Sequence, residues 1–252
     1  MKTSKLKSDR SVLCISLTAW LVVFLIGSLI GFASVASAQT QVSGTIVNQT
    51  WNSNNSPYVV VGNINVAGLT ILPDVTVQFA SNYTFEVDGV LQALGTPSSP
   101  IIFKGTNSGW QGIFFNYSSP GSVLACCVIS NSINSGINIL SSSPAITDCV
   151  IANNKAPVQG GGIYATNSTR GNLVLEDCII TNNIVGTPFD GTLGGDVGAG
   201  GGVAVHLAGG TLVMKGCLVS GNVVNPNMNN FGNFTGGGVA AADTTALLSY
   251  CG

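Results

Sequence analysis

Few residues in this sequence could support acid–base chemistry, and the first candidate is His206, the single histidine of the chain. In the run Val203-Ala204-Val205-His206, an alternation that buries Val203 and Val205 directs the imidazole outward. A general base needs defined hydrogen-bond geometry at the group whose proton it takes, and no acid partner for His206 is identifiable from the sequence. We therefore predict that His206 is a surface residue without a catalytic role.

Asp148 and Asp177 are the next candidates, because each directly precedes a cysteine in two similar segments. If these segments stack, the two residues lie roughly 5–10 Å apart, which would suit a pair of catalytic carboxylates. Gly216 and Tyr250 hold the same place in later segments, and this favours a role in turning the chain. The sequence thus predicts no catalytic residue and no metal ligand.

The remaining candidates suggest binding, and they lie in two long segments rich in Gly and Asn. Phe189, Phe231 and Phe234 could stack on sugar rings or pack against the body of the protein. Asp190 and Asp196 could hold calcium with help from carbonyl groups, but two acids are few for that ion, which favours a plain loop. We predict these five as the binding residues, with a glycan or a surface protein as partner. We expect no cofactor, with calcium as the alternative.

Charge is scarce in this chain. Charged residues make up 7% of it, against about 25% in ordinary soluble domains. Four of the eight basic residues lie in the first ten positions, so four remain against nine acids (ten less Asp9). This balance argues against nucleic-acid binding, which needs a basic surface. The hydrophobic share of 45% is high enough for a folded core.

Residues 1–38 have the features of a secretory signal peptide. A basic start precedes a long apolar run, and Ala36-Ser37-Ala38 provides the small-residue cleavage site. The apolar run is close to the ~20 residues that span a bilayer, so an uncleaved anchor is the alternative. We expect a secreted or cell-surface protein that contacts a membrane only through this segment, if it is not cleaved.

A repeat extends from about residue 120 to the end of the chain. Five segments align on a cysteine. The residue three before it is always apolar, as is the residue two after it in the first four: Leu124, Ile146, Leu175, Met214 and Leu248, then Ile129, Ile151, Ile180 and Val219. Recurring apolar columns predict stacked coils of a solenoid. Because Leu175 and Cys178 are an odd number of residues apart, both can face inward only if the chain turns a corner at Glu176-Asp177.

Glycine triplets mark a second position in each coil, at residues 160–162, 200–202 and 236–238. Glycine permits positive φ and close approach of stacked backbones. The excess length of the larger coils lies in residues 184–199 and 223–235, which should emerge on one side of the stack. We expect 39–57 to be a lead-in and cap, and 58–252 to be the coils. With no capping segment after Gly252, the stack reads as incomplete, truncated at its C-terminal end.

The aligned cysteines admit two interpretations. Six cysteines remain after cleavage at residue 38, and an oxidising compartment would permit disulfides. Inward residues stacked in register have parallel Cβ directions, which suit a disulfide poorly. We therefore favour a ladder of buried thiols.

Residues 59–116, with Leu69-Thr70-Ile71-Leu72-Pro73 and Trp110-Gln111-Gly112-Ile113, resemble the opening coils of secreted right-handed parallel β-helix repeat proteins of the pectin-lyase-like superfamily. The later coils are similar to the same group. The resemblance covers nearly all of residues 42–252 and implies an all-β fold, a right-handed parallel β-helix (β-solenoid). It carries little information on function, because this architecture hosts lyases, hydrolases and adhesins.

Enzymes of this superfamily use clustered aspartates, or calcium-binding acids with an Arg or Lys. This sequence has no Asp-Asp pair, and Arg170 is the single arginine after residue 38. The sequence therefore favours an exported, non-enzymatic module that binds a surface glycan or protein. The alternative is a polysaccharide lyase or glycoside hydrolase whose catalytic coils lie outside this stretch.

Overall fold

A computed structural model describes residues 39–167, 171–186, 200–225, 237–249 and 251–252 of the 252-residue chain. Residues 37–252 form one compact unit. The signal peptide expected at 1–38 lies outside the described residues, as do most of the two long segments 184–199 and 223–235.

The described residues form 21 strands and one short 3-10 helix. Their bounds are β1 Thr40–Ile46, β2 Gln49–Trp51, η1 Ser53–Asn55, β3 Tyr58–Ile71, β4 Thr76–Phe79, β5 Phe85–Leu94, β6 Ile101–Gly105, β7 Ile113–Asn116, β8 Val123–Ala125, β9 Cys127–Ser130, β10 Ile137–Leu140, β11 Ala145–Thr147, β12 Val150–Ala152, β13 Lys155–Ala156, β14 Ile163–Thr166, β15 Asn172–Glu176, β16 Ile179–Thr181, β17 Ile184–Val185, β18 Val203–Lys215, β19 Leu218–Ser220, β20 Val223–Val224 and β21 Val239–Ser249.

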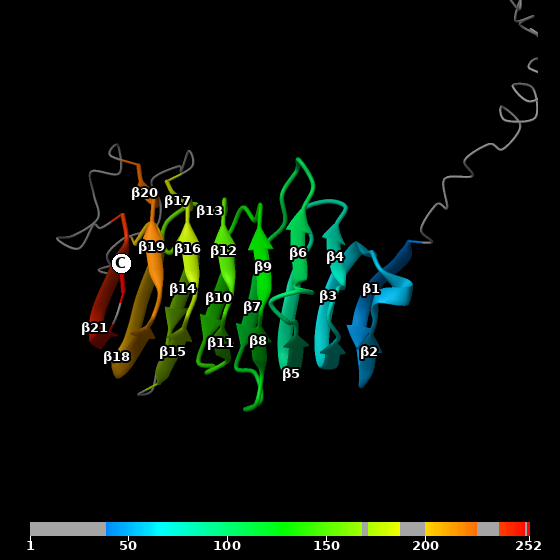
Figure 1. The fold of residues 1–252 in the computed structure, drawn as a ribbon, viewed down its shortest axis with the longest axis horizontal. Helices are drawn as coiled ribbons and strands as arrows, with labels where there is room; N and C mark the ends of the chain where they lie inside the picture. Colours follow the sequence, from blue (N-terminus) through cyan, green and yellow to red (C-terminus); the bar gives the residue numbers. More distant parts are fainter. Residues whose placement is uncertain (1–38, 168–170, 187–199, 226–236, 250) are drawn as a thin grey trace, which may run out of the picture. The chain divides into compact units, whose positions relative to one another are not determined.

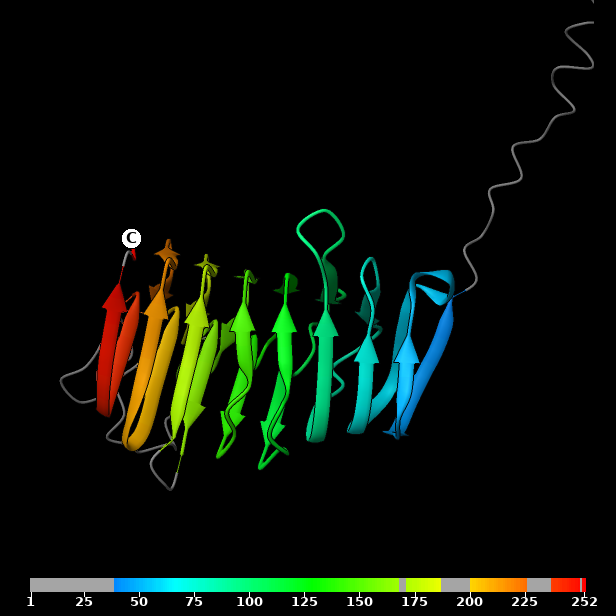
Figure 2. The ribbon, with the colours of Figure 1, turned by 60° about the horizontal axis from the view of Figure 1, so that its bottom comes forward.

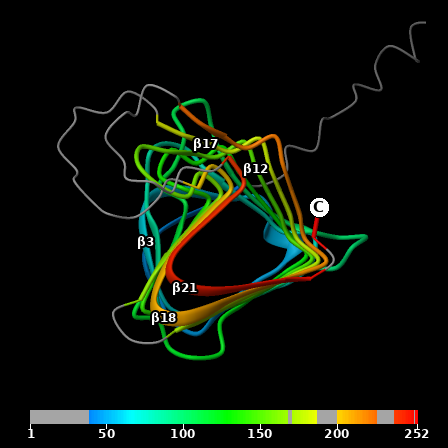
Figure 3. The ribbon, with the colours of Figure 1, turned by 90° about the vertical axis from the view of Figure 1, so that its left-hand side faces the viewer.

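The strands wind into a right-handed parallel β-helix, as the sequence predicts. Each strand pairs in parallel with the equivalent strand one coil away, for example β7 with β10 and β10 with β14. Figure 1 and Figure 2 show the coils side by side along the stack. Seen along the stack in Figure 3, the coils enclose a three-sided core.

The first four residues of the apolar column that precedes the repeat cysteines stack in the core as expected, whereas the fifth, Leu248, is in register with Met214 but 54% exposed. Leu124 pairs with Ile146, Ile146 with Leu175, and Leu175 with Met214, and all four are buried. Nearer the N-terminus the same core is filled by aromatic rings. Trp51 stacks on Tyr58 and Phe79 on Trp110, with ring centroids 4.5 and 4.0 Å apart. One continuous core therefore runs through the coils.

Two corners of each coil use left-handed backbone. The position before the repeat cysteine has φ of 48° to 63° and is held by Cys126, Asp148, Asp177 and Gly216. The position four after it has φ of 55° to 63° and is held by Asn131, Asn153, Asn182 and Gly221. Asn, Asp and Gly are the residues that adopt this conformation most readily. The corner expected at Glu176-Asp177 is confirmed.

A ladder of buried asparagines lies inside the second corner. The side-chain Nδ2 of Asn183 donates to the carbonyl of Ile151 at 2.9 Å, and its Oδ1 accepts from the backbone N–H of Asn154 at 2.9 Å. Asn154 and Asn222 make the same donations one coil away, to Ile129 and Ile180. These amides pair backbone groups that the turn would leave unsatisfied in the core.

The glycine triplets are required mainly by close packing of backbones. A Cβ at Gly201 would lie 2.5 Å from the carbonyl oxygen of Gly237, and one at Gly162 would lie 2.7 Å from that of Gly202. Within the described part of the triplets, only Gly160 has positive φ, at 56°. Stacked glycines therefore let the corner at the start of β14 and β18 repeat without side chains between the coils.

Residues 40–57 add two strands to the parallel stack. β1 pairs in parallel with β3 from Thr40 to Ile46, and β2 pairs with the later part of β3. The segment expected to be a lead-in and cap is thus built from strands in the same parallel arrangement as the coils.

Candidate functional site

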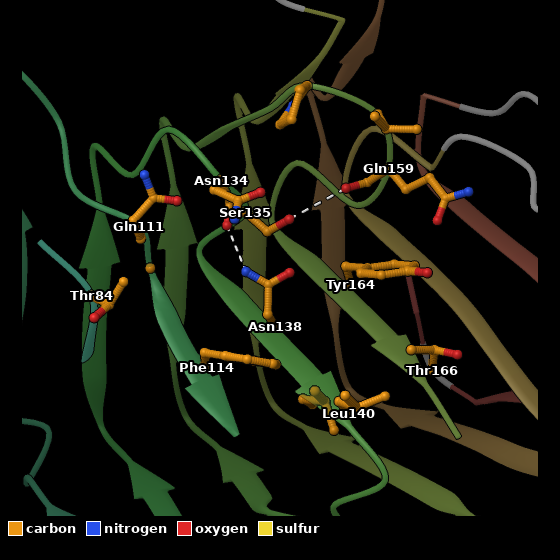
Figure 4. Close-up of a pocket in the computed structure, with 14 residues that line it drawn as sticks. Thr84, Gln111, Phe114, Asn134, Ser135, Asn138, Leu140, Gln159, Tyr164 and Thr166 are labelled. Atoms are coloured by element: carbon orange, nitrogen blue, oxygen red, sulfur yellow. Dashed lines mark hydrogen bonds between the residues drawn. The ribbon is translucent and has the colours of Figure 1, made fainter. Parts of the chain in front are cut away.

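A hollow lined by aromatic rings and amides lies on the outer face of β7, β10 and β14. Three outward side chains are in register there: Phe114 pairs with Asn138, and Asn138 with Tyr164. Gln111, Asn134 and Gln159 line the same groove, whose volume is about 540 Å³. Figure 4 shows the row of Phe114, Asn138 and Tyr164 crossing the strands. We call this hollow the groove.

Strand alternation places these side chains. In β7, β10 and β14 the first and third residues are buried and the second and fourth are half-buried on the outer face. Residues 157–159, which follow β13, line one side of the groove, and Ser135 Oγ donates to the carbonyl of Gln159 at 3.3 Å. Asn138 Nδ2 donates to the carbonyl of Asn134 at 2.6 Å, which fixes the orientation of this amide.

The groove is uncharged. Its described lining consists of aromatic, aliphatic, hydroxyl and amide side chains, together with one glycine and one proline. This described lining includes no acid, lysine, arginine or histidine. Burial raises the pKa of the Tyr164 phenol above its ordinary value, and a hydrogen bond with Thr166 partly opposes this. The phenol is therefore neutral at physiological pH and offers both a ring face and a hydroxyl.

His206 lies one coil beyond the groove, in register with Thr166. Its Nε2 is 3.8 Å from Oδ2 of Asp243 on β21. The sequence does not reveal this partner, because Asp243 lies 37 residues along the chain and comes next to His206 only when β21 stacks on β18. Both side chains are well exposed, at 40% and 66%, and such exposed pairs contribute little to stability.

The residues predicted to bind a ligand lie outside the described residues. These are Phe189, Asp190, Asp196, Phe231 and Phe234. The first three residues of each long segment are described, and the first two of them form β17 and β20. In a small parallel sheet, β17 pairs with β13 on one side and with β20 on the other. The long segments therefore start at equivalent places on adjacent coils.

Sequence reasoning missed the groove, although a signal for it is present. Aligning the coils on the glycine that precedes Ile113, Ile137 and Ile163 places Phe114, Asn138 and Tyr164 in one column. The inward columns do not reveal this outward one, because adjacent residues of a strand face opposite sides of the sheet.

Asp148 and Asp177 are exposed corner residues, as the sequence favours. Within the described ranges, no group of three or more His, Cys, Asp or Glu side chains is arranged to hold a metal ion. Asp190 and Asp196, where calcium is the alternative to a plain loop, lie outside the described residues.

Four of the five repeat cysteines form a ladder of free thiols in the core, namely Cys127, Cys149, Cys178 and Cys217, and the fifth, Cys251, is exposed. The Sγ atoms of Cys149 and Cys178 donate to the carbonyls of Thr147 and Glu176, both at 3.2 Å. The interaction with the Cys149 thiol and, after it, burial raise the pKa of Cys178 from 9.0 to about 12, although the Cys217 thiol partly opposes the shift. The pKa values of Cys149 and Cys217 are raised as well, mainly by Cys127 and Cys178 respectively.

This ladder predicts a loss of stability at alkaline pH. A thiol whose pKa is raised by folding stabilises the folded state below the unfolded pKa of 9.0, and this contribution is lost as pH rises toward about 12. We expect the free energy of unfolding in urea to fall between pH 8 and pH 10.5. Cys178→Ala should show a shallower fall; an identical pH dependence in both proteins would contradict this account.

No helix in the described part of the chain has the length and apolar character needed to cross a bilayer. The uncleaved-anchor alternative concerns residues 1–38, which are not described.

Comparison with known proteins agrees with this architecture. A family model described as a right-handed β-helix region matches residues 36–195, more than half of the chain. The protein bark beetle of Drosophila melanogaster is 38% identical over 74 residues, which are 27% of this chain and 2% of that protein. This chain therefore spans only a small part of the length of that relative. No solved structure matches the chain significantly. The stacked parallel coils and the extent of the family match together show that this chain belongs to the right-handed β-helix family.

Proposed function

We propose that this protein is an exported, non-enzymatic β-helix module that binds a glycan at the cell surface or in a matrix, through the groove on β7, β10 and β14. The observation that carries the proposal is the uncharged row of Phe114, Asn138 and Tyr164, with further amides beside it. The signal features of residues 1–38 support export.

Glycans suit this lining for two reasons. The faces of pyranose rings carry C–H groups that pack well on aromatic side chains, and Phe114 and Tyr164 are half-buried on an otherwise open sheet face. Sugar hydroxyls need donors and acceptors around the ring edge, and Gln111, Asn134 and Asn138 supply both.

The groove favours binding over catalysis. Hydrolysis or elimination of a glycan needs titratable groups within reach of the scissile bond. In the described lining of the groove the titratable side chain is the Tyr164 phenol, which its raised pKa keeps neutral, and the other polar side chains are hydroxyls and amides. The His206–Asp243 pair lies one coil beyond the groove and is open to solvent.

A glycan array followed by calorimetry tests the proposal. We expect the protein to bind at least one glycan without turnover, and Tyr164→Ala to weaken that binding at least tenfold because the stacking surface is lost. Val174→Ala is the matched control, because Val174 is an exposed strand residue outside the groove lining, and it should bind as the wild type does. Absence of binding to every glycan, or cleavage of the bound one, would refute the proposal.

A further inference from the structure

The row of Phe114, Asn138 and Tyr164, which runs along the stack axis, indicates a narrower class of glycan. Resting on the proposed function, we infer that the groove takes an extended, uncharged, β-1,4-linked glycan of at least three sugars, which lies parallel to the stack axis and crosses β7, β10 and β14.

The spacing of the two aromatic rings indicates the direction in which the glycan lies. Phe114, Asn138 and Tyr164 are on successive coils in strict register. Parallel strands are about 4.8 Å apart, so the rings are separated by roughly 10 Å along the axis. In a glycan with equatorial linkages, each pyranose extends the glycan by nearly the distance between two adjacent coils. A glycan along the axis therefore places one sugar on each of these three coils.

The alternation of ring and amide fits the two-fold ribbon of such a glycan. In a β-1,4-linked ribbon each sugar is turned over relative to its neighbours, so the first and third sugars present the same face to the protein. Phe114 and Tyr164 meet these two faces. The middle sugar presents hydroxyls to Asn138, whose Oδ1 can accept a hydroxyl proton while its Nδ2 is engaged by the Asn134 carbonyl.

The row sets limits on both sides of this three-sugar site. Before Phe114, the same row holds Glu86, whose Oε1 accepts a hydrogen bond from Asn116 Nδ2 at 2.7 Å. A carboxylate here repels uronate or sulfated sugars, and no cationic side chain belongs to the described lining of the groove to offset this repulsion. After Tyr164 the row continues with Ala204, which is fully buried and offers no ring surface. Binding should therefore saturate soon after three sugars.

Calorimetry with oligosaccharides of one to six sugars tests this inference, using the cello-, manno- and xylo-series. In at least one series we expect the affinity to rise at least tenfold from two sugars to four, and then to change less than threefold up to six. Phe114→Ala should remove most of the gain beyond the disaccharide. Malto-oligosaccharides, whose α-linkage curves the chain, should bind at least tenfold more weakly than the best series.

A comparison of two glycans that differ in charge completes the test. Mannohexaose and hexamannuronate share their linkage and differ at C6, so we expect the uronate to bind more weakly. Glu86→Gln, which keeps an acceptor for Asn116, should narrow this difference without changing the affinity for the neutral chain.

The outcomes separate the two proposals. If Tyr164→Ala abolishes binding but single sugars bind as tightly as tetrasaccharides, or uronates and malto-oligosaccharides bind best, the inference about the ligand fails while glycan binding stands. If no glycan binds at all, both fail.

Discussion

Asn183→Ala is expected to lower the free energy of unfolding by about 3–5 kcal/mol, because each buried group left without a partner costs about 1–3 kcal/mol. The Asn183 amide pairs the Ile151 carbonyl, the Asn154 backbone N–H and the Asn154 side chain, all inside the core. Alanine removes these partners from the buried Ile151 carbonyl and the Asn154 backbone N–H, while the Asn154 Nδ2 keeps only its hydrogen bond to the Ile129 carbonyl. The ladder also continues through Asn222, so the loss affects hydrogen bonds on both sides.

Equilibrium unfolding in guanidinium chloride, followed by circular dichroism, measures this effect. Asn182→Gly is the matched control, since Asn182 is exposed with φ of 55° and Gly221 holds the same corner one coil later with φ of 63°. The control should lie within about 1 kcal/mol of the wild type. A loss below 1 kcal/mol for Asn183→Ala would mean that the ladder does not stabilise the corner.

Gly202→Ala is expected to destabilise the protein by about 3 kcal/mol, the upper part of the range for overpacking a rigid site. A Cβ there would lie 2.8 Å from the Gly238 carbonyl oxygen and 2.9 Å from Nδ2 of Asn222. Neither neighbour can move freely, because one is backbone in the stack and the other is a rung of the asparagine ladder.

The equivalent position one coil later provides the comparison. A Cβ on Gly238 would meet only Val219 Cγ1, at an ordinary contact distance of 3.8 Å. Gly238→Ala should therefore unfold within about 1 kcal/mol of the wild type in the same guanidinium titration. Equal losses for the two variants would show that the glycines act through chain flexibility and not through the packing of adjacent coils.

The fold could be predicted from the sequence because its signals are local and repeated. The columns of Leu124 and Ile129 recur at each coil, and the odd spacing between Leu175 and Cys178 requires a corner whichever strands pair. The turn at Asn153 and Asn182 was also foreseeable, since asparagine tolerates positive φ. That the following Asn154 and Asn183 turn inward was not, because surface and buried asparagines look the same in a sequence.

The site was less predictable because it depends on register. His206 meets Asp243 only after 37 residues of chain have returned to the next coil. Phe114 and Tyr164 are 50 residues apart and become neighbours of Asn138 only when three coils align. The binding role of Phe189 and Phe231 stays a prediction from their place in the long segments, because both residues lie outside the described residues.

A crystal structure of the protein with the tightest-binding tetrasaccharide tests the central claim most directly. The account predicts a sugar chain parallel to the stack axis over β7, β10 and β14, with one sugar on Phe114, the next beside Asn138 and the third on Tyr164. A ligand bound along a single strand, or on another face of the β-helix, would contradict it.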